Sequence, residues 1–219
     1  MKRNQAGFTL IEIAIVLVII GLLLGGVLKG QELINSAKVK NLSADFKNTP
    51  VFIYGYQDKF KALPGDDANV ATHVTGGTAC TPAAAGLCAP GNGIIDGAWN
   101  ATAITSESFV FWQHVRLAGL APGPTDTASA DYLPKNTVGG TIGVTNAANT
   151  AITGVKGSYI ICSDSIAGKF AKQMDTTLDD GNTAAGSLQA TTAGTATGGT
   201  AVATVSIVDD TPYLVCMGI

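Results

Sequence analysis

Few side chains of this sequence are suited to chemistry, and the largest group is a set of acidic turns. These turns place carboxylate and amide oxygens in loops, and Ca²⁺ prefers such ligands. None of them has the spacing of an EF-hand loop, and Asp and Asn commonly bond their own backbone in turns. Turn formation is therefore the favoured interpretation, calcium is the alternative, and no other cofactor is expected. The candidate residues are Asp66, Asp67, Asn92, Asp96, Asp179 and Asp180.

Four cysteines form the second group: Cys80, Cys88, Cys162 and Cys216. They permit three pairings, and an even count beyond an export segment indicates disulfides in an oxidising compartment. Four buried thiols are the alternative. Cys80 and Cys88 flank the short stretch TPAAAGL, a spacing suited to a small closed loop. Cys216 on a C-terminal strand could meet Cys162 on an earlier strand, and that bond would close a long loop.

The two histidines, His73 and His114, offer little support for catalysis. A histidine-based triad or a zinc site needs further partners at suitable spacing, and the sequence contains no GxSxG, HExxH, Walker A or GxGxxG pattern. His114 falls in an expected helix, where a lone histidine is more often structural. The sequence predicts that the protein is not an enzyme.

Composition excludes other classes. Charged residues make up 13% of the 219 residues, and the formal net charge is -3. A nucleic-acid-binding protein is usually basic, and a disordered acidic chain carries more charge, so neither class fits. The length is sufficient for a membrane segment and one globular domain.

The element that must position these residues begins with an apolar run near the N-terminus. No charge occurs between Ile13 and Leu28, and Lys2 and Arg3 precede the run, which indicates a cytoplasmic N-terminus. A helix over residues 8–28 would span about 30 Å, the thickness of a bilayer core. A secretory signal peptide is disfavoured because no small-x-small cleavage site follows. Apolar residues instead continue at helical spacing to Phe46.

Glu12 interrupts this run, and an unpaired carboxylate in hydrocarbon costs on the order of 2.5 kcal/mol or more. The stretch Gly7-Phe8-Thr9-Leu10-Ile11-Glu12, after its basic leader, resembles the prepilin signature of type IV pilins and type II secretion pseudopilins. The resemblance implies that a membrane peptidase cuts after Gly7, that Phe8 is then N-methylated, and that Glu12 guides assembly. Glu12 would pair with the Phe8 amine of its own chain or of a neighbouring subunit. A simple membrane anchor with a snorkelling Glu is the alternative.

The resemblance implies an α+β, type IV pilin-like fold. A leader over residues 1–7 would precede a transmembrane and filament-core helix over 8–30. The amphipathic half of the same helix would cover 31–62, bent at Pro50, and a head with an antiparallel sheet would cover 63–219. Gly21, Gly25, Gly26 and Gly30 permit close helix contacts in the first half.

Within the head, periodicity predicts a short amphipathic helix from Ser106 to Ala118 and a strand from Val155 to Ser163. A second short helix is expected after Ile166, with a turn at Asp179-Asp180-Gly181. The low-complexity segment 183–204 is expected to loop across the surface. The last residues, 201–208 and 213–219, are expected to form a hairpin.

These expectations indicate a structural subunit of a type IV pilus-like filament, stored in the inner membrane and then extracellular. Its partners would be other copies of the chain, the prepilin peptidase and N-methyltransferase, and the inner-membrane assembly machinery. Adhesion and twitching motility follow from the resemblance only. A periplasmic pseudopilin of type II secretion is the alternative, although two cysteine pairs and a Thr-rich head favour a pilus. A membrane-anchored binding module is a further alternative.

Overall fold

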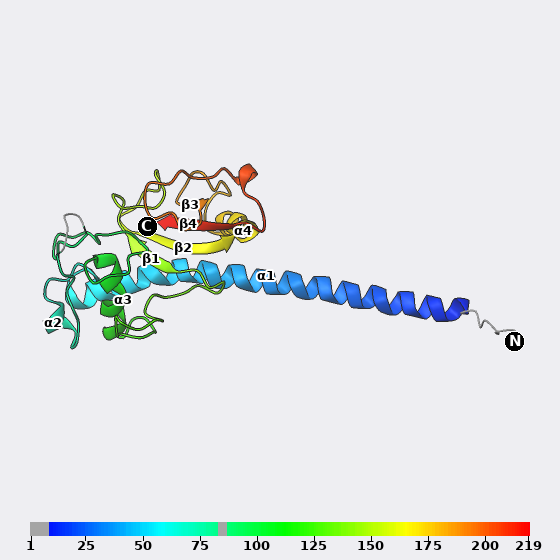
Figure 1. The fold of residues 1–219 in the computed structure, drawn as a ribbon, viewed down its shortest axis with the longest axis horizontal. Coiled ribbons are helices and arrows are strands. Elements are labelled where there is room, and N and C mark those ends of the chain that lie inside the picture. The colour runs from blue at the N-terminus through cyan, green and yellow to red at the C-terminus, as the bar shows by residue number, and fades with distance from the viewer. Residues whose placement is uncertain (1–8, 83–86) are drawn as a thin grey trace, which may run out of the picture. The chain divides into compact units, whose positions relative to one another are not determined.

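A computed structural model describes residues 9–82 and 87–219. It has the α+β layout of a pilin, in which a long N-terminal helix precedes a head with a four-stranded antiparallel sheet (Figure 1). The chain divides into two compact units, residues 1–38 and residues 39–219. The helices are α1 (Leu10–Phe60), α2 (Val70–His73), α3 (Glu107–Leu117), α4 (Gly168–Leu178) and the 3-10 turn η1 (Thr204–Ser206), and the strands are β1 (Ile142–Thr145), β2 (Ile160–Ala167), β3 (Leu188–Thr192) and β4 (Pro212–Gly218).

The helix α1 runs without a break through Pro50 and ends at Phe60, where Lys61 adopts a positive φ of 57°. Its second half presents one stripe of residues to the core of the head, with members three or four positions apart except for one adjacent pair, Leu42 and Ser43. That spacing places them on one face of a helix. The buried members are Val39, Leu42, Ser43, Phe46, Thr49, Ile53 and Tyr56.

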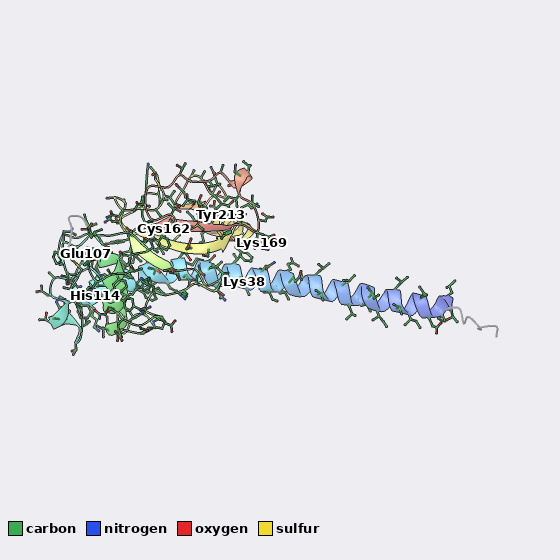
Figure 2. The ribbon with its side chains drawn as sticks, viewed as in Figure 1. Lys38, Glu107, His114, Cys162, Lys169 and Tyr213 are labelled. Carbon is green, nitrogen blue, oxygen red and sulfur yellow. A yellow bond between two sulfur atoms is a disulfide. The ribbon has the colours of Figure 1, made fainter. Side chains whose placement is uncertain are left out.

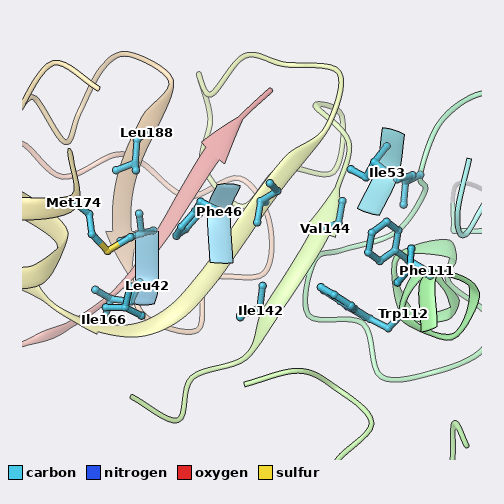
Figure 3. Packing of buried hydrophobic residues seen from close by; sticks show 14 of the residues in the cluster. Leu42, Phe46, Ile53, Phe111, Trp112, Ile142, Val144, Ile166, Met174 and Leu188 are labelled. Atoms are coloured by element: carbon cyan, nitrogen blue, oxygen red, sulfur yellow. The ribbon is translucent and has the colours of Figure 1, made fainter. Parts of the chain in front are cut away.

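The sheet has the strand order β1-β2-β4-β3, and all neighbouring strands are antiparallel. Figure 3 shows how the sheet and α1 share one core: Leu42 lies beside Ile166 and Met174, and Phe111 of α3 lies near Ile53. Every labelled side chain in that view belongs to one buried cluster. Burial of this apolar surface is the main force that holds the head together.

The bounds predicted for the strand over residues 155–163 are wrong at both ends. The strand β2 begins at Ile160, just after Tyr159, which exchanges both backbone hydrogen bonds with Ile219. It continues to Ala167 across a register shift between Ser163 and Ile166, where Ser165 has a φ of 59°. A bulge of this kind interrupts the apolar alternation, so the sequence pattern ends too early.

The expected C-terminal hairpin is wrong, and the surface loop expected over 183–204 is wrong where the strand β3 forms. The strand β4 pairs with β2 on one side and with β3 on the other, so both of its edges are occupied. Its partner β3 lies inside the low-complexity segment, with Leu188 and Ala190 fully buried. Residues 201–208 instead hold the short turn η1. Threonine and alanine fit a buried strand although their repetition resembles a linker.

The helix α3 forms where it is expected, but it is not amphipathic. Every residue from Glu107 to Arg116 is buried. Loops cover the face that the sequence marks as polar: Arg116 donates to the carbonyls of Pro122, Pro124 and Tyr132. A polar face satisfied by backbone acceptors can be buried at little cost.

Two disulfides occur in the head. Cys80 pairs with Cys88, and Cys162 pairs with Cys216, which are the pairings that their positions favour. Cys162 and Cys216 stand directly opposite each other on β2 and β4.

Candidate functional site

The first half of α1 exposes an almost unbroken apolar surface. By length and composition the helix can cross a membrane, and its most apolar window has no buried residue. Side chains of this kind need a cover of lipid or of other protein. Those exposed up to Leu28 are Leu10, Ile11, Ile13, Ile15, Val16, Leu17, Val18, Ile19, Ile20, Leu22, Leu23, Leu24, Val27 and Leu28.

Glu12 lies in the first turn of this helix and is bonded to Thr9. The Glu12 Oε2 atom accepts the Thr9 backbone N–H at 2.7 Å and the Thr9 hydroxyl at 2.6 Å. The Glu12 N–H in turn points to the Thr9 hydroxyl oxygen at 3.4 Å. This is the reciprocal arrangement of a capping box, which satisfies N–H groups that a helix start leaves unpaired. The sequence pattern Thr-x-x-Glu contains the signal for it.

Gly7 and Phe8 lie outside the described residues. The pairing of Glu12 with the Phe8 amine therefore stays a prediction. Within the part of the chain that is described, the carboxylate has local donors in Thr9 and is exposed.

The four glycines in the first half of α1 make no close contact that requires a glycine. A Cβ atom added at Gly21, Gly25, Gly26 or Gly30 would meet no other heavy atom within 4 Å. Each residue is nevertheless helical. Since a glycine inside a helix costs about 1 kcal/mol relative to alanine, any reason for these four must come from outside the subunit.

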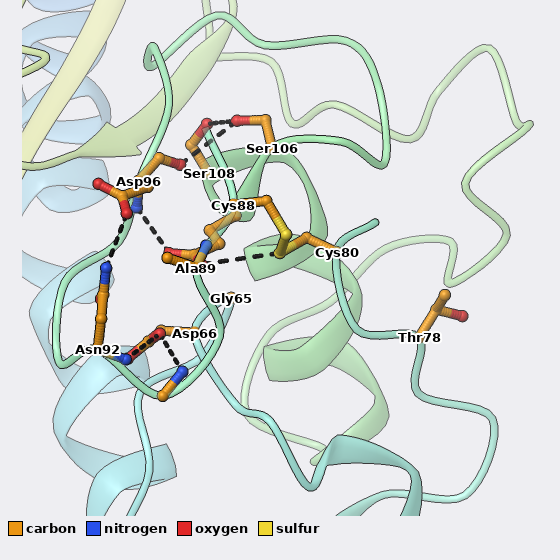
Figure 4. Close-up of a disulfide and its surroundings, with 12 residues drawn as sticks. Gly65, Asp66, Thr78, Cys80, Cys88, Ala89, Asn92, Asp96, Ser106 and Ser108 are labelled. Atoms are coloured by element: carbon orange, nitrogen blue, oxygen red, sulfur yellow. Dashed lines mark hydrogen bonds between the residues drawn. A yellow bond between two sulfur atoms is a disulfide. The ribbon is translucent and has the colours of Figure 1, made fainter. Parts of the chain in front are cut away.

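Of the calcium candidates, Asp66 is already engaged by the backbone of a loop. Its Oδ1 accepts the N–H groups of Gly91 (2.5 Å) and Asn92 (3.0 Å), and its Oδ2 accepts that of Gly93 (2.7 Å) (Figure 4). The Asn92 amide donates to Asp96 at 2.9 Å. Burial outweighs these hydrogen bonds and raises the pKa of Asp66. Asp66, Asn92 and Asp96 therefore lie together in one hydrogen-bonded loop. Bonds of this kind are those that the turn interpretation expects.

Asp67 is bonded to side chains instead. Its Oδ2 accepts the Tyr56 hydroxyl and faces the His73 Nδ1, both at 2.7 Å, and its Oδ1 accepts the Asn69 N–H. Burial alone would raise the pKa of Asp67, but these hydrogen bonds hold it below its usual range. Asp67 thus ties the end of α1 to α2.

Glu107 is a buried carboxylate that sequence reasoning did not single out. Its oxygens accept the N–H groups of Ala89 at 2.6 Å and Asp96 at 2.8 Å, next to the Cys80–Cys88 disulfide. Burial raises its pKa to about 7 against the effect of these bonds. Its position as the first residue of a helix was the available signal, because acidic residues are favoured there.

His114 has a structural role, as the sequence indicates. It is fully buried in α3, and Figure 2 shows it on the same helix as Glu107. Its Nδ1 accepts the Gly65 N–H and its Nε2 faces the Thr78 carbonyl, both at 2.9 Å. Burial lowers its pKa, so the neutral ring joins two loops.

Asp179 and Asp180 lie just beyond α4, and the structure brings a third carboxylate to them. One oxygen from each of Asp175, Asp179 and Asp180 lies within 4.8 Å of the others. Asp175 was not a sequence candidate, although it lies only four residues before Asp179, the residue that follows the helix.

A comparison with family models identifies the N-terminal segment. Residues 2–28 match the prokaryotic N-terminal methylation motif, the type IV prepilin and pseudopilin signature. Gly7, Phe8 and Glu12 lie inside the matched range. No curated protein and no solved structure matches the chain.

Proposed function

We propose that this chain is a structural subunit of a type IV pilus-like filament. One observation carries the proposal: the methylation motif leads directly into a helix whose apolar surface is exposed from Leu10 to Leu28. Exposure of apolar surface to water costs roughly 25 cal/mol per Å², so a helix of this kind that leaves the membrane would have to pack against other copies in a filament. The same surface suits lipid while the subunit is stored in the inner membrane.

Processing would occur in the segment that carries the motif. The prepilin peptidase would cut after Gly7, and the new N-terminus at Phe8 would be methylated. The Phe8 amine would then lie about one helical turn from Glu12, within reach of the same chain or of a neighbour. In a low-dielectric bundle such a pair is strong and an unpaired carboxylate is costly, so Glu12 would set the register of each incoming subunit.

Mass spectrometry of the mature N-terminus tests this processing. The expected chain begins at Phe8 and carries one added methyl group. A chain that keeps Met1 in cells with an active prepilin peptidase would overturn the proposal. The alternative of a membrane-anchored binding module predicts that uncut chain.

The kind of filament needs a separate measurement. Shearing intact cells and identifying this chain in the released fibres would support a surface pilus. Fibres confined to the periplasm, and lost together with a type II secretion platform, would support the pseudopilin alternative. The two disulfides suit a head outside the cytoplasm, which both a surface pilus and a periplasmic pseudopilus provide, so this measurement is the one that separates them.

A further inference from the structure

The C-terminal end of α4 gathers three carboxylates where the helix itself disfavours negative charge. Asp175 lies in the last turn of α4, and Asp179 and Asp180 follow the helix. One oxygen from each lies within 4.8 Å of the others. The helix dipole puts partial negative charge at this end, so a cation beside the cluster would be favourable.

Asp175 provides an independent sign of a ligand. Its side chain is fully buried, and its Oδ2 atom has no hydrogen-bond partner. Its Oδ1 accepts only a long bond, at 3.3 Å, from the Gly181 N–H. A buried carboxylate oxygen without a donor is costly, and such atoms are rare in folded proteins.

The other two carboxylates each keep one oxygen available. Asp179 accepts the Leu188 N–H through Oδ2, and Asp180 accepts the Asn182 N–H through Oδ1. The lysines of α4 are engaged elsewhere, because Lys169 pairs with Asp210 and Lys172 with Asp209.

We infer that Asp175, Asp179 and Asp180 bind one divalent cation, and that this cation is Ca²⁺. The donors are all oxygens, and two of them come from a loop, which suits the variable geometry of calcium better than the strict octahedron of magnesium. The Oδ2 atom of Asp175 supplies the buried ligand. Because Asp179 also holds the first residue of β3, the cation would fasten the end of α4 to the edge strand of the sheet.

The proposed cation site lies within the head and does not depend on filament assembly. The cluster differs from Asp66 and Asp67, whose four carboxylate oxygens each have a hydrogen-bond partner within the protein.

Equilibrium dialysis with ⁴⁵Ca²⁺ on the full chain in detergent tests the inference. The expected result is one ion per chain with a dissociation constant of roughly 0.1–1 mM, and much weaker binding of Mg²⁺. Both tryptophans, Trp99 and Trp112, lie in the head, so their fluorescence reports its unfolding. Calcium at about 100 times the dissociation constant should raise the melting temperature by about 5–10 °C.

Variants identify the site. Asp175→Asn should weaken calcium binding at least about tenfold, because it removes a charged ligand. Without calcium its melting temperature should equal or exceed that of the parent chain. Asp131→Asn changes the charge equally at an exposed position of another loop and should bind calcium normally. If Asp175→Asn fails to fold, the double variant Asp179→Asn/Asp180→Asn provides the same test at more exposed positions. No binding by the parent chain at 10 mM calcium, or equal binding by the parent and the site variants, would overturn the inference.

Discussion

Across the first turn of α1, the Glu12 carboxylate accepts the backbone N–H and the hydroxyl of Thr9, and the Glu12 N–H points back to the Thr9 hydroxyl oxygen. The carboxylate that the filament proposal assigns to assembly therefore also belongs to the capping box of its own helix. This arrangement gives the subunit a satisfied Glu12 before any neighbour arrives. During assembly, the Phe8 amine would have to replace Thr9 as the donor to the Glu12 carboxylate or bond to the carboxylate alongside Thr9.

Glu12→Gln separates the capping role from the charge. The amide oxygen can still accept the Thr9 hydroxyl, so the helix start should be retained, but the pairing with an amine is lost. We expect the variant to remain in the membrane and to yield far fewer fibres. Glu12→Ala should assemble equally poorly. Quantifying this chain in membranes and in sheared fibres checks the prediction, and normal fibre yield from Glu12→Ala would contradict it.

Thr9→Ser and Thr9→Val test the other half of the pair. Serine keeps the hydroxyl and should behave like the parent chain, whereas valine removes the cap, which typically costs about 1 kcal/mol. If capping by Thr9 holds Glu12 ready for assembly, Thr9→Val should lower fibre yield while membrane levels stay constant. Equal yields from the two variants would show that the hydroxyl has no part in assembly.

Gly25→Leu should leave the subunit intact and weaken the filament. Because no atom of the described chain lies near a Cβ at this position, folding of the head should be unchanged by tryptophan fluorescence. A larger side chain would prevent close approach of a neighbouring helix. The matched control is Ile15→Leu, which conserves volume on the same exposed helix. A full yield of fibres from Gly25→Leu would show that helices do not pack closely there.

Glu107 should make the stability of the head depend on pH. Its pKa is about 7 in the folded protein against an ordinary value of 4.5. Its contribution to stability is therefore fully present below about pH 4.5 and is lost as the pH rises through 7. The change amounts to at most about 3 kcal/mol, at 1.36 kcal/mol per unit of pKa.

Comparison with Glu107→Gln isolates this group, because the amide cannot ionise. Burial also raises the pKa of Asp45, to about 6. The pH dependence of stability that comes from Asp45 is the same in the parent chain and in the variant. We expect the melting temperature of the parent chain to fall more steeply than that of the variant between pH 5 and pH 8. A constant difference between the two proteins across this range would contradict the prediction.

The long helix and the terminal strand were predictable because local patterns specify them. The spacing of Val39, Leu42 and Phe46 is helical regardless of what covers it, and the apolar run in β4 has no competing interpretation. The strand β3 was not predictable, because its residues become a strand only by pairing with β4, which lies some 20 residues further along the chain.

Among the site residues, some are likewise specified by a local pattern and others only by tertiary contacts. Thr9 and Glu12 are three positions apart, so their pairing follows from local geometry. Glu107 is different, because its partners Ala89 and Asp96 belong to a loop that folds back on α3. The role of Asp175 likewise depends on tertiary burial, which removes its carboxylate from water. A local pattern can place such a group on a helix face but does not show that the face is covered.

Removal of each disulfide should destabilise the head by a different amount. Cys162 and Cys216 are 54 positions apart and Cys80 and Cys88 only 8, so the first bond restricts the unfolded chain more strongly. On loop-closure entropy we expect a loss of about 4 kcal/mol from Cys162→Ala/Cys216→Ala and about 2.5 kcal/mol from Cys80→Ala/Cys88→Ala. Denaturant unfolding followed by tryptophan fluorescence measures both losses. Buried contacts around Cys162 would add to the first loss, so an equal or reversed order would show that loop closure does not govern the stability of this head.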